Sequence, residues 1–94
     1  MTFSLPSVKE AVNYFLMDTS FGPFHIEQKN GEYYYRSTEN TPELLCKIVY
    51  VEDDSLSTLI QAFSRHSTVV ILDTSKNPIV CATAAQMINF LHNS

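Results

Sequence analysis

The sequence predicts an α/β fold in which two β-α-β-β-α repeats pack as one compact module. Apolar residues at helical spacing alternate along the chain with short runs of β-branched and aromatic residues, as in mixed helices and strands. Residues 69–83 read as two apolar strands joined by a polar turn. Strands that are apolar on both faces are typically buried. The same order of elements can be traced in both halves of the chain.

The first half is predicted to begin with an edge strand over residues 1–5 and a helix over residues 7–17. Ser7 suits the N-cap of this helix, and Glu10 stands where the partner in a capping box belongs. The following apolar residues recur at helical spacing: Val8, Ala11, Val12, Phe15 and Leu16.

A hairpin and a short helix are predicted to complete the first half. The dipeptide Asn30-Gly31 is a strong turn signal between strands over residues 24–27 and 33–35. Strand alternation should expose at least one of the three tyrosines in the second strand. Because Pro42 can occupy the first turn of a helix, residues 42–45 are predicted to be helical.

The second half is predicted to contain a strand over residues 46–51, a helix from about residue 55, the hairpin over 69–83 and a helix over 84–91. Acidic residues at 52–54 suit the positive end of a helix dipole. The predicted apolar positions of the two helices are Leu56, Leu59, Ile60 and Phe63, then Met87, Ile88, Phe90 and Leu91.

The two halves can be laid over one another as repeats. Ser7-Val8 falls on Ser55-Leu56, and the strands of the two hairpins follow in the same order. We therefore expect a degenerate repeat over residues 1–46 and a second repeat over residues 47–94, which together form one domain.

Composition argues against several classes of function. The formal net charge is -4, with ten acidic residues against six basic ones. This argues against a broad nucleic-acid interface, which needs a basic face, and against docking on an anionic membrane. No apolar run approaches the roughly 20 residues of a membrane-spanning helix. The sequence also has no glycine-rich phosphate loop and no close metal-ligand spacing, so we predict neither an enzyme nor a metal site.

The two cysteines, Cys46 and Cys81, each lie within an apolar run. Buried free thiols in a reducing cytoplasm are the favoured interpretation, and a disulfide or redox pair is the alternative. The first six residues lack the basic start and the apolar stretch of a signal peptide. We therefore expect a cytoplasmic protein.

Three segments of the second half resemble a CBS repeat. Residues 49–56 look like the family's opening strand and helix start, and residues 66–73 look like its second strand, which typically closes on Asp. Residues 77–83 look like its third strand, where many members have Gly and this chain has Cys81. The resemblance is best over residues 47–91 and weaker in the first half.

The resemblance implies a fold and a role. Two CBS repeats pair through their sheets into a disc-like Bateman module, which often dimerises. Many such modules bind adenosine-containing ligands between the repeats and act as regulatory sensors. This implies a homodimer that binds an adenine nucleotide (AMP, ADP or ATP) or S-adenosylmethionine and signals to a regulated partner protein. The alternative is a ligand-free module for protein–protein interaction or dimerisation.

The resemblance also implies ligand-binding residues. The family pattern places Ser or Thr at the end of the third strand and Asp or Asn three residues later, where they can meet a ribose. Ser37 and Asn40 fit this pattern in the first half, and Thr83 and Gln86 stand there in the second, where Gln86 departs from the pattern. Arg36 is close enough in sequence to meet a phosphate. The structural alternatives are helix N-caps for the serine, asparagine and threonine and a solvated charge for the arginine.

Overall fold

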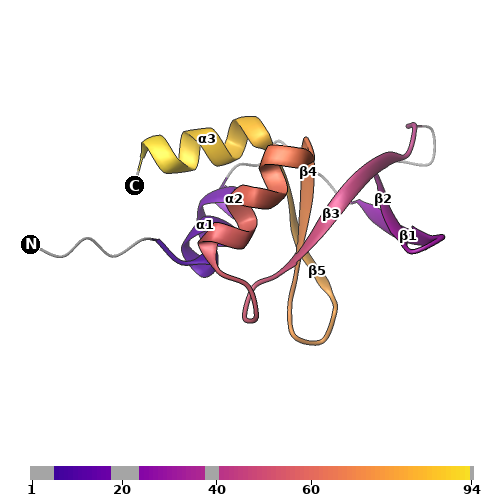
Figure 1. The fold of residues 1–94 in the computed structure, drawn as a ribbon, viewed down its shortest axis with the longest axis horizontal. Helices are drawn as coiled ribbons and strands as arrows, with labels where there is room; N and C mark the ends of the chain where they lie inside the picture. The colour runs from indigo at the N-terminus through magenta and orange to yellow at the C-terminus, as the bar shows by residue number, and fades with distance from the viewer. Residues whose placement is uncertain (1–5, 18–23, 38–40, 94) are drawn as a thin grey trace, which may run out of the picture.

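The computed structural model describes residues 6–17, 24–37 and 41–93. Three helices lie beside one mixed sheet, and the β1–β2 hairpin extends away from the helices at the right of the view (Figure 1). The elements are α1 (Val8–Met17), β1 (His25–Lys29), β2 (Glu32–Arg36), β3 (Leu44–Tyr50), α2 (Leu56–Arg65), β4 (Thr68–Leu72), β5 (Pro78–Thr83) and α3 (Ala84–His92). The predicted α/β class is confirmed.

The five strands form a sheet in the order β1-β2-β3-β4-β5. Strands β3 and β4 are parallel, and the other neighbouring strands are antiparallel. Strand β3 changes partner along its length, because Leu44–Cys46 pairs with β2 and Lys47–Tyr50 pairs with β4. One strand therefore joins the hairpin to the rest of the sheet.

The helices cover one face of the β3-β4-β5 region. Helix α3 packs against both α1 and α2, while α1 contacts β5 and α2 contacts β3 and β4. The largest side chains buried completely in this layer are Phe15, Leu59 and Ile71. The buried strand residues on this face are Val49, Val69, Ile71, Val80 and Ala82. They occupy alternate positions, as expected for one face of a pleated sheet.

A second apolar cluster lies on the opposite face of the sheet. Its buried members are Tyr35, Cys46, Val70, Leu72 and Cys81. Aromatic and aliphatic side chains of the hairpin segment, including Phe24 and Ile26, pack against it. All five residues of β4 are therefore buried, which confirms the prediction from its apolar sequence. Both cysteines are free and buried, as expected.

Both predicted hairpin turns are present. Asn30 and Gly31 have φ angles of 55° and 81°, the left-handed pair that a two-residue hairpin turn requires. In the β4–β5 turn, Oδ1 of Asp73 accepts hydrogen bonds from the main-chain N–H groups of Ser75 and Asn77, each at 2.9 Å. This local bonding explains why a strand ending in Asp can be followed by a tight turn.

The short helix predicted over residues 42–45 is wrong. Leu44 and Leu45 lie in β3, where they pair with Tyr35 and Tyr34 of β2. Pairing with β2 satisfies the backbone hydrogen-bonding groups of this segment. The preference of proline for a first helical turn is too weak to outweigh this pairing. The predicted boundary after residue 46 falls inside β3, and the predicted edge strand over residues 1–5 lies outside the described residues.

In the described ranges, no helix combines the length and the apolar character that crossing a lipid bilayer requires.

Candidate functional site

A pocket of about 470 Å³ opens where β2 and β5 end and where β3 and β4 begin. We call it the strand-end pocket. Its lining residues are Tyr35, Ser37, Thr41, Pro42, Leu44, Thr68 and Thr83. It is the place where the chain brings two of the sequence-predicted ligand residues, Ser37 and Thr83, to the same cavity.

Strand pairing assembles this pocket. The register of β4 and β5 sets Thr68 opposite Thr83, and the register of β2 and β3 sets Tyr35 opposite Leu44. Just beyond β2, the Ser37 hydroxyl donates to Oγ1 of Thr41 at 3.3 Å. The pocket is therefore lined by residues from four strands and from the segment between β2 and β3. These segments are far apart in the sequence, and the sheet brings them together.

The chemistry of the pocket is apolar with hydroxyl groups. Tyr35, Pro42 and Leu44 are its apolar lining residues, and none of the described residues that line it is charged. The hydroxyl-bearing lining residues besides tyrosine are Ser37, Thr41, Thr68 and Thr83. Small-molecule sites typically have about 300–1,000 Å³ and combine an apolar lining with a few polar groups. The pocket therefore suits a flat, uncharged group that accepts or donates a few hydrogen bonds.

The Tyr35 side chain stays a neutral phenol in this environment. Burial raises the pKa of Tyr35, and its interaction with the Cys81 side chain raises it further. The Tyr35 ring also packs against Phe24, with 5.8 Å between ring centroids. A fixed aromatic ring thus forms one wall of the pocket.

Arg36 faces away from the strand-end pocket. Neighbouring strand residues point to opposite faces, so the residue after Tyr35 lies on the other side of β2. Its Nη2 contacts Oε1 of Glu27 at 3.4 Å. Its Nε is buried and has no hydrogen-bond partner within the described part of the chain. Arg36 is thus not placed with Ser37 and Thr83.

Thr83 and Gln86 form a capping box at the start of α3. Thr83 lines the pocket, but Gln86 does not and is only 8% exposed. The Gln86 side-chain oxygen accepts from the Thr83 N–H at 2.8 Å. Thr83 is thus the N-cap of α3, the structural role that the sequence offered as the alternative to ligand binding. Asn40 lies outside the described residues.

Sequence reasoning missed Thr68, Leu44 and Tyr35 as pocket residues. Thr68 could have been found, because the predicted hairpin with a turn near Asp73 sets the start of one strand opposite the end of the other. Leu44 could not, because it was assigned to a helix. The only sequence feature that pointed to Tyr35 is its place in a run of three tyrosines.

Across the described ranges, no group of three or more His, Cys, Asp or Glu side chains is placed to hold a metal ion. The two thiols are also poor nucleophiles: burial raises the pKa of Cys46 to about 11 and that of Cys81 to about 12. Comparison with protein-family models, curated proteins and solved structures gives no match to this chain.

Proposed function

We propose that this protein is a small regulatory ligand-sensing module that binds an adenine nucleotide, or a related adenosyl ligand, in the strand-end pocket. The observation that carries the proposal is the pocket itself: about 470 Å³, apolar, and lined by both Ser37 and Thr83. An adenine ring is flat and largely uncharged, and it needs an apolar slot with a few hydrogen bonds.

In the proposed complex, the base lies against Tyr35 and Leu44, and the hydroxyls of Ser37 and Thr83 meet the ribose or the ring nitrogens. None of the described residues that line the pocket is cationic, so we expect any phosphate group to point out of it. The adenosine part therefore supplies most of the affinity. We expect adenosine to bind with an affinity close to that of AMP and ATP.

The likeness to a CBS repeat supports a regulatory role. The order β3-α2-β4-β5-α3, with β3 and β4 parallel, follows the predicted order for residues 47–91. The first half lacks the closing helix predicted at residues 42–45, so the likeness rests on the second half. We further propose a homodimer that signals to a partner protein in the cytoplasm, a reducing compartment compatible with free Cys46 and Cys81.

Thermal unfolding with added ligands tests the proposal. Adenosine, AMP, ATP and S-adenosylmethionine should each be titrated, and a ligand at a hundred times its Kd should add about 2.7 kcal/mol to the free energy of unfolding. Leu44→Gln should weaken binding several-fold because Leu44 lines the pocket. Leu45→Gln is the matched control, since Leu45 is similarly exposed but does not line it. No stabilisation by any of the four ligands would contradict the proposal.

The second candidate is a ligand-free interaction or dimerisation module. It is favoured by large apolar side chains that remain exposed on the helical layer: Leu16, Met17, Ile88 and Leu91. Light scattering across a range of protein concentrations would test dimer formation. A dimer that forms without ligand, in a protein that none of the four ligands stabilises, would favour this second candidate.

A further inference from the structure

A basic pocket lies between the second half of α2 and β3, on the helix-covered side of the sheet. Its volume is about 530 Å³. Its lining residues are Lys47, Thr58, Gln61, Ala62, Ser64, Arg65 and His66. Two of the chain's six lysines and arginines and one of its three histidines thus line one cavity, and no carboxylate in the described part of the chain lines it.

This concentration of positive charge stands out in an acidic protein. Every lysine and arginine of the chain lies in the described ranges. Lys9, Lys29 and Arg36 each form an ion pair with a glutamate. Within those ranges Lys76 forms none, and neither do Lys47 and Arg65, the two that line the basic pocket. Their charges are therefore not neutralised by the protein and remain available to an anion.

The fold explains why the cations meet. Lys47 lies two residues before Val49, which is buried under the helices, so both point to the helical side of β3. Arg65 is the last residue of α2, and His66 follows it. A cation in the last turn is favoured by the helix dipole, which accounts for Arg65 alone. It does not account for Lys47, which comes from a strand.

We infer that the basic pocket binds a small phosphate-bearing anion. A phosphate group carries several acceptor oxygens, which can be met by the Arg65 guanidinium, the Lys47 ammonium and the Thr58 hydroxyl. The Ser64 hydroxyl donates instead to the Gln61 carbonyl oxygen at 2.6 Å. The cavity is larger than a single phosphate needs, so it has room for a pyrophosphate or a phosphate monoester. The inference is independent of the proposed function, because no residue that the structure describes lines both pockets.

Titration with inorganic phosphate and with pyrophosphate, followed by amide chemical shifts, tests the inference. We expect saturable shifts at Lys47 and in the last turn of α2, with pyrophosphate binding at least as tightly as phosphate. Added sodium chloride should weaken the binding, because the site is exposed to solvent. Neither probe contains a base, so failure here leaves the adenosine proposal untouched.

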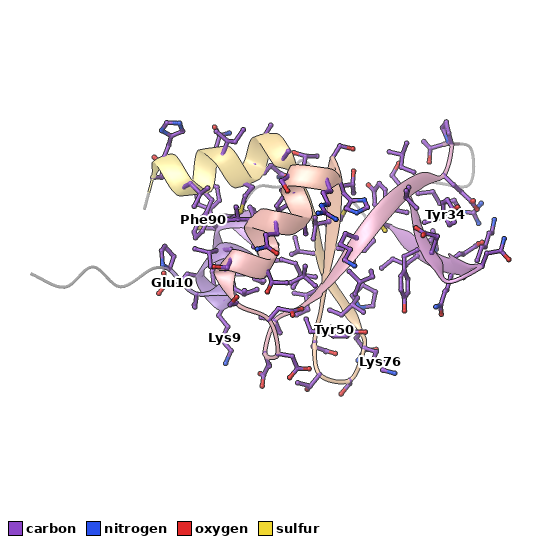
Figure 2. The ribbon with its side chains drawn as sticks, viewed as in Figure 1. Lys9, Glu10, Tyr34, Tyr50, Lys76 and Phe90 are labelled. Atoms are coloured by element: carbon purple, nitrogen blue, oxygen red, sulfur yellow. The ribbon has the colours of Figure 1, made fainter. Side chains whose placement is uncertain are left out.

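Charge-matched variants decide whether the site is specific. Lys47→Gln and Arg65→Gln should each weaken pyrophosphate binding about tenfold, as loss of a charge-assisted hydrogen bond would. Lys76→Gln removes the same charge from the β4–β5 turn (Figure 2). Because Arg65 precedes β4 and Lys76 follows it, this variant should leave the affinity unchanged within about twofold. Equal weakening in all three variants, or shifts that do not saturate, would overturn the inference.

Discussion

The main-chain N–H of Thr83 donates to Oε1 of Gln86 over 2.8 Å, and the N–H of Gln86 donates back to Oγ1 of Thr83 over 3.3 Å. The two residues thus satisfy polar groups in the first turn of α3. Thr83→Ala should lower the free energy of unfolding by about 1 kcal/mol, measured by urea denaturation.

Thr83→Ser is the control for this prediction, because it keeps the hydroxyl oxygen that caps the helix. Its stability should stay close to that of the unmodified protein. A loss in the serine variant as large as in the alanine variant would show that the methyl group, not the cap, is what matters at this position.

Leu59 and Ile60 are neighbours on α2 with opposite environments. Leu59 is fully buried in the helix-side core, whereas Ile60 is 40% exposed. Leu59→Ala should reduce the free energy of unfolding by about 2–5 kcal/mol through lost burial and a residual cavity. Ile60→Ala should cost much less. Similar losses from the two substitutions in urea denaturation would contradict this placement of α2.

Gly31 occupies a backbone conformation that suits few other residues. Its φ is +81°, and a Cβ atom built there would meet no heavy atom within 4 Å. The cost of Gly31→Ala is therefore one of backbone strain, about 1–2 kcal/mol. Gly31→Asn should cost less, because asparagine tolerates the left-handed region. If the two variants unfold at the same urea concentration, this explanation fails.

The buried thiols should make the protein sensitive to alkali. Burial raises the pKa of Cys46 to about 11 and that of Cys81 to about 12, from 9.0. Above pH 9 the unfolded chain releases thiol protons that the folded chain retains, so the free energy of unfolding falls as pH rises. Their contribution is complete below pH 9 and is lost progressively up to about pH 12.

Cys46→Ala and Cys81→Ala isolate this effect from other groups that titrate in alkali. Each variant should lose less stability between pH 9 and pH 11 than the unmodified protein does, as measured by urea denaturation at each pH. Identical pH dependence in the three proteins would rule out thiol ionisation as a cause.

Most of the fold could be predicted because its local signals agree with its tertiary packing. Asn30-Gly31 indicates the first turn, and the apolar run over residues 69–72 indicates a buried strand. Ser7 and Glu10 indicate a helix start, and the Glu10 N–H does donate to the Ser7 hydroxyl oxygen at 3.1 Å. Leu44 failed as a helical residue because pairing with a distant strand decided its conformation. Such a contact leaves no local signal.

The candidate site was less accessible to sequence reasoning. The resemblance to a CBS repeat implies Ser37 and Thr83 as ligand residues at strand ends, and both line one pocket. Arg36 was chosen for its nearness in sequence, but strand alternation sends it to the opposite face. The basic pocket has no local sequence signal, because Lys47 and Arg65 are separated by a turn and a whole helix.

Strand β3 bonds to the hairpin through three residue pairs and to β4 through four. The hairpin therefore depends on β3, whereas the unit formed by β3, β4, β5 and the helices has its own core. Units of this kind open with different free energies. In hydrogen exchange, amides of β4 should report the complete unfolding of the molecule, and amides shared by β1 and β2 should exchange sooner, through an opening that leaves the helical layer intact.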